Sequence, residues 1–277
     1  MLVNLNDVLV DAKKNKYAVG LFNTVNLEMA RGVILAAERT KSPVIIGSAE
    51  VLLPSSASLY ELSDMLIPMA KRASVPVVLH YDHGLTEEKV ELAMNLGFTS
   101  VMYDCSTLDF DGNVKKVSEL VGRAHKKGIT VEAELGHVGT EELFAREDAY
   151  TKPEDAVRFC ELTDCDALAI AVGTCHGAYK FTPKLDFKLI NTIKGLVKQP
   201  LVLHGGSGLS DNDFSSAIEN GIAKINIFTD INTACAKAAH DNYAETKGLT
   251  DIFLSEVEAV CAATEKKMRL FGCCGRA

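Results

Sequence analysis

The sequence predicts an eight-stranded parallel α/β barrel, the (β/α)8 or TIM-barrel fold, formed by a single domain. Short runs rich in apolar and β-branched residues alternate with segments whose apolar residues recur every three or four positions. The repeat of about 23–33 residues suits a βα unit, and the nearly continuous apolar runs are typical of parallel strands buried on both faces. Eight such units close into a barrel.

The eight expected strands lie, in chain order, near 18–22, 44–49, 77–82, 100–105, 130–135, 167–172, 201–205 and 224–228. Helical patterns between them cover 27–40, 86–97, 113–128, 152–164 and 212–221. Thr86 followed by two glutamates reads as an N-cap with an acidic first turn, and Gly97, Gly128 and Gly221 stand where helices should end. An open doubly wound sheet would require a Gly-rich fingerprint after the first strand, which "LFNTVNLE" lacks.

The expected domain therefore spans residues 1–277, with C-terminal helices after strand eight at about 231–277. The chain is 47% apolar and 24% charged, which is an ordinary composition for a protein with a large core. A net charge of −8 without a Lys/Arg block argues against nucleic-acid and membrane partners, and favours a small-molecule partner. There is no signal-peptide pattern and no apolar run of about 18 residues.

The eight cysteines are scattered and form no C-x-x-C pair. In a chain of this size, such a distribution indicates reduced thiols and hence a cytoplasmic protein, rather than a disulfide framework or a structural zinc finger.

Polar residues gather where the expected strands end, which is the face on which barrels of this kind carry their active sites. They are His80, Asp82, His83, Asp104, Glu134, His176, His204 and the stretch "NIFTD". A lone histidine at a strand end is more often structural, but His83, His176 and His204 come from separate strands. Three imidazoles and an open position describe a catalytic zinc site. The other histidines, His125, His137 and His240, lack partners in the sequence and are expected at the surface.

The third strand ends in "HYDHG", where His80 and Asp82 share one face of an ideal strand. Asp82 and His83 can both face the barrel centre only if the pleat ends there, and Gly84 would permit that turn. His80 then supports the site by packing. Asp82 suits either metal binding or proton transfer at the substrate.

Two further acidic residues, Asp104 and Glu134, admit three interpretations. They could form a second metal position, hold the metal-binding histidines, or make an ion pair with a barrel lysine.

The other half of the expected mouth suits an anion. Loops after strands seven and eight often bind phosphate in barrels, and here they read "HGGSG" and "NIFTD". The groups offered are the backbones of Gly205 and Gly206, the Ser207 hydroxyl, Asn226 and Thr229.

These motifs together resemble the class II, zinc-dependent ketose-bisphosphate aldolases, which include the fructose- and tagatose-1,6-bisphosphate aldolases. The similarity covers essentially the whole chain and rests on "FN" at 22–23, "HYDHG" at 80–84, "EAELGHVG" at 132–139, "GTCHG" at 173–177, "LVLHGGSG" at 201–208 and "KINIFTD" at 224–230. The resemblance implies a carbohydrate-metabolising lyase that reversibly cleaves a ketose (bis)phosphate to dihydroxyacetone phosphate and an aldehyde. A homodimer or a dimer-based tetramer is also implied.

The resemblance also implies roles for individual residues. His83, His176 and His204 would bind Zn2+, Asp82 would exchange the proton with the aldehyde-side hydroxyl, and Asp104 and Glu134 match a second divalent metal position. Glu142 matches a mobile-loop glutamate that moves the proton at the ketone-derived carbon. The residues matching the substrate and phosphate site, where Na+ or K+ often binds, are Asn23, Gly177, Gly205, Gly206, Ser207, Asn226, Ile227, Phe228 and Thr229.

Two positions depart from the pattern of bisphosphate-specific relatives. Ala49 stands where a Ser or Thr usually helps to hold the second phosphate, with Ser48 one residue away, and Val257 or Leu254 stands where a late helix supplies an arginine. Arg269 and Arg276 could compensate if the C-terminal tail folds over the mouth. An alternative substrate is therefore a ketose 1-phosphate with a non-phosphorylated aldehyde half. A metal-dependent hydrolase and a non-catalytic barrel subunit are the alternatives of another class.

Overall fold

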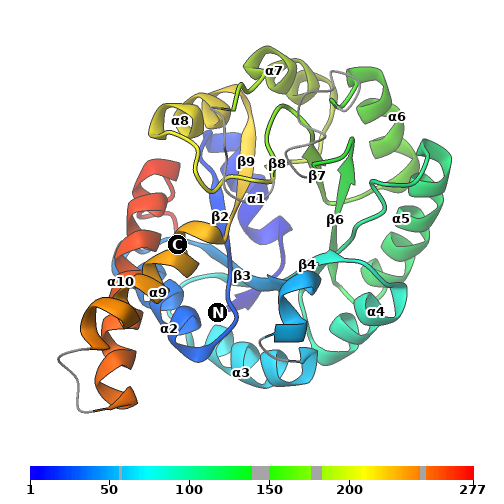
Figure 1. The fold of residues 1–277 in the computed structure, drawn as a ribbon. Helices are drawn as coiled ribbons and strands as arrows, with labels where there is room; N and C mark the ends of the chain where they lie inside the picture. The colour runs from blue at the N-terminus through cyan, green and yellow to red at the C-terminus, as the bar shows by residue number, and fades with distance from the viewer. Residues whose placement is uncertain (56–57, 139–149, 176–182, 244–247) are drawn as a thin grey trace.

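The computed structural model describes residues 1–55, 58–138, 150–175, 183–243 and 248–277, and it confirms the closed parallel barrel (Figure 1). The strands are β1 (Leu2–Val3), β2 (Val19–Asn23), β3 (Val44–Ala49), β4 (Val77–Gly84), β5 (Ser100–Tyr103), β6 (Thr130–Leu135), β7 (Ala167–Ile170), β8 (Leu201–Leu203) and β9 (Ile222–Ile227). Strands β2 to β9 pair with their neighbours in parallel, and β9 pairs back with β2 to close the ring. The short β1 lies outside this ring, beside the beginning of β4.

Helices between the strands surround the barrel (Figure 1). They are α1 (Asn6–Asn15), α2 (Leu27–Thr40), α3 (Leu59–Arg72), α4 (Glu87–Leu96), α5 (Phe110–His125), α6 (Pro153–Thr163), α7 (Phe187–Leu196), α8 (Asp211–Asn220), α9 (Thr229–Tyr243) and α10 (Leu249–Phe271), with a 3-10 segment η1 (Glu50–Ser55) after β3. Within the described ranges, no helix is both long and apolar enough to span a membrane.

Local signals explain several helix boundaries. Ser58 and Ser210 form capping boxes that satisfy the first backbone N–H groups of α3 and α8. Gly97 and Gly221 follow the last residues of α4 and α8, as expected. Thr86 takes the N-cap position of α4, but its side chain makes no capping hydrogen bond.

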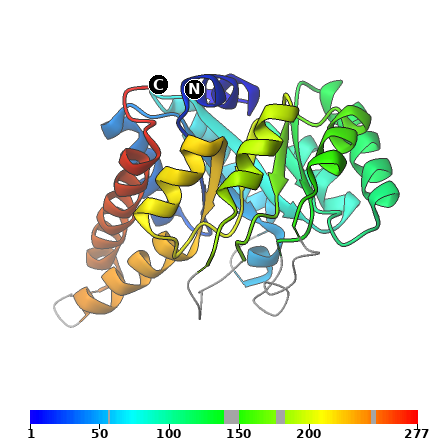
Figure 2. The same cartoon turned by 90° about the horizontal axis from the view of Figure 1, so that it is seen from above.

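Helix α1, which was not among the helical patterns identified in the sequence, packs at the N-terminal ends of β2 and β9. Most of its residues are polar, but Val8, Leu9 and Ala12 are buried, and Leu9 is fully buried. The Lys13 ammonium donates to the backbone carbonyls of residues 197–199 at 2.7–3.2 Å. In Figure 2, α1 and the C-terminus lie at the same end of the molecule. This end of the barrel is therefore covered, and the opposite end is left for a site.

The contact between β3 and β4 requires a glycine at position 47. A Cβ atom on Gly47 would lie 1.8 Å from the carbonyl oxygen of His80, its register partner in the neighbouring strand. In contrast, a Cβ on Gly122 in α5 would meet no atom within 4 Å.

We therefore expect Gly47→Ala to destabilise the barrel by about 2 kcal/mol or more, because backbone must move to relieve the overlap. Gly122→Ala is the matched control and should be neutral or stabilising by about 0.5–1 kcal/mol, since alanine is the better helix former. Urea unfolding of both variants measures the difference. Equal stability of the two variants would contradict the packing described for β3 and β4.

Candidate active site

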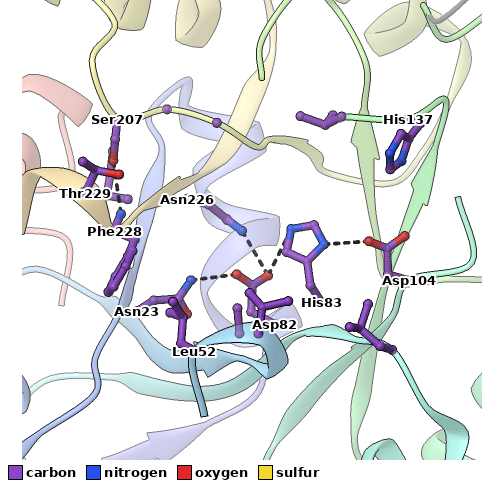
Figure 3. Close-up of a pocket in the computed structure, with 17 residues that line it drawn as sticks. Asn23, Leu52, Asp82, His83, Asp104, His137, Ser207, Asn226, Phe228 and Thr229 are labelled. Carbon is purple, nitrogen blue, oxygen red and sulfur yellow. Dashed lines mark hydrogen bonds and ion pairs between the residues drawn. The ribbon is translucent and has the colours of Figure 1, made fainter. Parts of the chain in front are cut away.

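A cavity of about 630 Å³ opens at the C-terminal ends of the strands, large enough for a small metabolite (Figure 3). Its described lining consists of Asn23, Ala49, Val51, Leu52, Asp82, His83, Leu85, Asp104, His137, Val138, Gly205, Gly206, Ser207, Asn226, Ile227, Phe228 and Thr229. Figure 3 shows Ser207, Phe228 and Thr229 on one side, His83 and Asp104 on the other, and Asp82 between them. His176, Gly177 and Glu142 lie outside the described residues.

Two consecutive residues of β4, Asp82 and His83, both enter this cavity (Figure 3). The pairing of β4 with β5 shifts in register between Tyr81 and Gly84, and His83 takes a left-handed backbone conformation with φ 43°. The pleat therefore breaks as expected, but at His83 and not through a left-handed Gly84. Gly84 is needed for packing instead, since a Cβ there would lie 2.5 Å from Val90 Cγ2.

Carboxylates hold one nitrogen of each of two imidazole rings. His83 Nδ1 lies 2.8 Å from Asp104 Oδ2, and His204 Nε2 lies 2.8 Å from Glu132 Oε1. Such contacts orient each ring, so that a metal ion would bind the other nitrogen, Nε2 of His83 and Nδ1 of His204. The two ring centroids are 4.6 Å apart.

The described part of the cavity floor fits a divalent cation. Ligand atoms of Asp82, His83 and His204 lie within 4.8 Å of one another, and the same holds for His83, Asp104 and Glu134. The buried Glu134 Oε2 lies 3.1 Å from His204 Nδ1. Two imidazoles and nearby carboxylates are a donor set that suits zinc.

The charge balance also favours a cation. Burial acts to lower the pKa of His204, but the carboxylates of Glu132 and Glu134 outweigh it and raise that pKa to about 10. A place where carboxylates stabilise positive charge on an imidazole suits a metal ion equally well.

Asp82 is held by two amide groups. Asn23 Nδ2 donates to Oδ2 at 2.8 Å, and Asn226 Nδ2 donates to Oδ1 at 3.1 Å (Figure 3). Burial acts to raise the pKa of Asp82, but His83 and then Lys224 outweigh it, so the pKa lies far below its usual value. Asp82 is therefore an oriented carboxylate that is ionised at neutral pH.

A buried ion pair that the sequence analysis did not predict lies beneath these groups. Lys224 Nζ lies 3.0 and 2.9 Å from the two oxygens of Glu132, and it donates to Asn226 Oδ1 at 2.6 Å. Burial acts to raise the pKa of Glu132, but Lys224 and His204 lower it to about 2. The barrel lysine thus pairs with Glu132, not with Asp104 or Glu134 as one interpretation had it. Residues two apart share a face of a strand, so "EAE" at 132–134 places Glu132 on the same face as Glu134, and "KIN" at 224–226 places Lys224 on the same face as Asn226. This pattern could have predicted both charges inside the barrel.

The remaining histidines differ in part from expectation. His80 is buried and bonds Ser100 Oγ through Nδ1 at 2.7 Å, in keeping with a supporting role. His137 was expected at the surface without a partner, but it lines the cavity and bonds Ser106 Oγ at 2.9 Å. The N–H of the next residue, Val138, donates to Glu134 Oε1 at 3.0 Å. His125 also has a partner, Asp166, at 2.8 Å, whereas His240 is exposed as expected.

The anion-type half of the cavity is formed by the ends of β8 and β9. Gly205 has φ 66°, and a Cβ there would lie 2.2 Å from the Cys175 carbonyl oxygen, so glycine is required. Ser207 Oγ accepts from the Phe228 N–H at 3.2 Å and ties the two loops together. Thr229 begins α9 at the cavity edge, where a helix N-terminus favours negative charge.

The side of the cavity next to β3 and β4 is apolar. Ala49, Val51, Leu52 and Leu85 line it, and no Lys or Arg is among the described lining residues. Ser48 is buried, pairs in register with Tyr81 on the other face of the sheet, and does not line the cavity.

The arginines of the C-terminal tail do not reach over the mouth of the barrel to supply the missing positive charge. Arg269 pairs with Glu265 at 3.1 Å, and the Arg276 guanidinium lies 5.2 Å from the centre of the Tyr17 ring. Backbone bonds from residues 275 and 277 to the end of α2 hold the tail near the start of β2, away from the mouth.

Comparison with known proteins gives a consistent result. The family model for class-II fructose-bisphosphate aldolase matches residues 3–276. The chain is 42% identical to the uncharacterized protein YdjI of Escherichia coli K12 over 270 residues, covering 96% of each, and 39% identical to a fructose-bisphosphate aldolase of Staphylococcus aureus strain Mu50 over 283 residues, covering 100% and 99%. A crystal structure described as the YdjI aldolase of E. coli K12 superposes with a TM-score of 0.92 at 39% identity, covering 100% of both chains.

The buried His80 generates a prediction about stability and pH. Burial lowers its pKa to about 4, from an ordinary value of about 6.5 in the unfolded chain. The unfolded chain therefore binds a proton that the folded chain does not between these values, and stability falls on acidification. From pH 7 to pH 5 the loss from this residue should be about 2 kcal/mol. Urea unfolding of wild type and His80→Gln at both pH values isolates it. The same pH dependence in both proteins would refute the assignment.

Proposed function

The chain belongs to the class-II fructose-bisphosphate aldolase family of lyases, and from this premise we propose that it carries out the metal-dependent, reversible aldol cleavage of a ketose phosphate to dihydroxyacetone phosphate and an aldehyde. The observation that carries the proposal is the break in β4, which brings the oriented Asp82 carboxylate and the His83 imidazole into one cavity.

His83, His204 and, from outside the described residues, His176 would hold Zn2+. Zinc at this place would supply a Lewis acid that polarises the ketone carbonyl and stabilises the charge developing on it. Asp104 and Glu132 hold the other ring nitrogens of His83 and His204 and so set which nitrogens face the metal. Together with His83, the Asp104 and Glu134 carboxylates could also form a second divalent metal position.

Asp82 would take the proton from the hydroxyl on the aldehyde side of the bond that breaks, and return it in the direction of synthesis. The amides of Asn23 and Asn226 keep its oxygens aimed into the cavity. Glu142 would move the proton at the ketone-derived carbon.

The phosphate of the ketone half would bind at the ends of β8 and β9. Gly177, Gly205, Gly206, Ser207 and residues 226–229 form this proposed subsite, where backbone N–H groups and the start of α9 suit an anion, with Na+ or K+ as a further partner.

The family membership favours a lyase over the hydrolase and the non-catalytic subunit considered from the sequence. We further propose a cytoplasmic enzyme, in keeping with its eight free cysteines, that acts as a homodimer or a dimer-based tetramer.

For the aldehyde half, two substrates compete. A 1,6-bisphosphate of fructose or tagatose is the substrate type suggested by the family. The apolar side formed by Ala49, Val51, Leu52 and Leu85 specifically favours a ketose 1-phosphate whose aldehyde half carries no phosphate, since a phosphate there would lose its solvation without gaining a cationic partner from the described lining.

Replacing Asp82 by Asn tests the proposed base. The amide cannot take the hydroxyl proton, so kcat should fall by about 10²–10⁴ while the zinc content stays near that of wild type. Release of dihydroxyacetone phosphate, followed through a coupled reductase, and metal analysis measure the two quantities. Activity within about threefold of wild type would remove Asp82 from the mechanism.

A substrate panel tests the apolar side. We expect cleavage of ketose 1-phosphates with kcat/KM at least about tenfold above that for fructose or tagatose 1,6-bisphosphate, and a several-fold gain for the bisphosphates in Ala49→Ser, because one hydroxyl restores a hydrogen-bond donor. A strong wild-type preference for a bisphosphate would overturn the second candidate and leave the first.

A further inference from the structure

The Glu50 carboxylate, at the start of η1, is nearly buried and accepts hydrogen bonds from three sides. Its Oε2 accepts from the Tyr81 hydroxyl at 2.8 Å and from the Leu85 backbone N–H at 2.7 Å, while its Oε1 accepts from Lys89 Nζ at 2.8 Å. Burial acts to raise the pKa of Glu50, but these donors, Lys89 foremost, bring it below its usual value. The side chain is therefore an ionised anchor outside the cavity lining.

The two donors to Oε2 enclose Asp82 and His83 in the sequence. Tyr81 precedes them and Leu85 follows them, so one oxygen atom holds both ends of the bend in β4. In the neighbouring strand β3, Ala49 pairs in register with Asp82. Glu50 directly follows Ala49, so this pairing places it next to the bend.

This bend needs an external constraint. His83 has a φ of 43° although it is not glycine, and the pairing with β5 shifts in register between Tyr81 and Gly84. A left-handed conformation at a residue with a side chain persists only where the surroundings impose it. Pairing with β5 is interrupted across residues 82 and 83, whereas the hydrogen bonds to Glu50 hold Tyr81 and Leu85 on either side of them.

We propose that Glu50 is a positioning residue that clamps residues 81–85 in the bent conformation, and thereby places the Asp82 carboxylate and the His83 imidazole for proton transfer and metal binding. The inference rests on the proposed function, because it gives the clamped residues their roles. Glu50 acts through Asp82 and His83 and touches no reacting atom.

The test compares three variants. Glu50→Ala removes all the contacts. Glu50→Gln/Lys89→Met keeps a carbonyl oxygen for Tyr81 and Leu85 and removes the lysine that a neutral amide cannot pair with. Lys89→Met alone is the control for loss of the ion pair. For each metal-free protein, Zn2+ affinity is measured by competition with a chromophoric chelator. For each zinc-loaded protein, kcat and KM are measured with the best ketose phosphate.

We expect Glu50→Ala to bind Zn2+ about tenfold or more weakly and to lose at least about tenfold in kcat with a smaller change in KM, because displaced catalytic groups lower the rate more than they lower binding. The double variant and Lys89→Met should stay within about threefold of wild type in both quantities. This rescue by a neutral side chain distinguishes positioning by two hydrogen bonds from a general need for a buried charge.

Three results would overturn the proposal: unchanged Zn2+ affinity and kcat in Glu50→Ala, equal losses in Glu50→Ala and the double variant, or an equal loss in Lys89→Met. Should Glu50→Ala not fold, Tyr81→Phe removes one of the two donors, and unchanged Zn2+ affinity and kcat there would count against the clamp in the same way. If Glu50→Ala binds Zn2+ more weakly as expected, but the wild-type protein cleaves no ketose phosphate, the clamp is supported and the proposed function is refuted.

Discussion

The buried ion pair between Lys224 and Glu132 is the interaction on which the site depends. Two opposite charges are fully buried in the barrel, where burial of either charge alone would be very costly. The pair uses its remaining hydrogen-bonding capacity on neighbours: Glu132 holds the His204 ring, and Lys224 holds the Asn226 amide. Asn226 in turn holds Asp82. The orientations of an expected metal ligand and of the expected base thus follow from one pair of charges.

A second constraint meets the first at Asp82. The break in β4 turns two consecutive side chains into the cavity, and Asp104 then fixes the His83 ring. A carboxylate contacts one nitrogen of each of these imidazoles, so that a metal ion would bind the other nitrogen. The cavity above them has the proposed phosphate subsite at the ends of β8 and β9 and an apolar side at β3 and β4. The proposed base Asp82 and the proposed metal ligand His83 thus come from one strand, β4, whereas the proposed phosphate subsite comes from β8 and β9.

Strand spacing predicted the barrel, because parallel strands buried on both faces leave a strong apolar pattern. It also placed His83, His204, Asp82 and Asp104 at one end of the barrel, where Asp82, His83 and Asp104 line the cavity and His204 lies beside Asp82 and His83. It did not predict α1, whose ten residues are largely polar, nor the place of the late arginines, which tail contacts decide. It assigned the turn to Gly84 because left-handed conformations favour glycine, whereas the structure imposes that conformation on His83. The pattern of polar residues at strand ends does not predict the role of Glu132, because this residue lies deeper in the barrel, two positions before Glu134.

In the proposed reaction, Asp82 and a zinc held by the histidines would act on one ketose phosphate in this cavity. The most direct measurement is release of dihydroxyacetone phosphate by wild-type protein before chelation, after chelation, and after zinc is restored, with Mg2+ as the comparison ion. We expect loss of cleavage after chelation and its recovery with Zn2+ but not with Mg2+, since imidazole ligands suit zinc and magnesium prefers oxygen. Undiminished cleavage in the fully metal-free protein would contradict it.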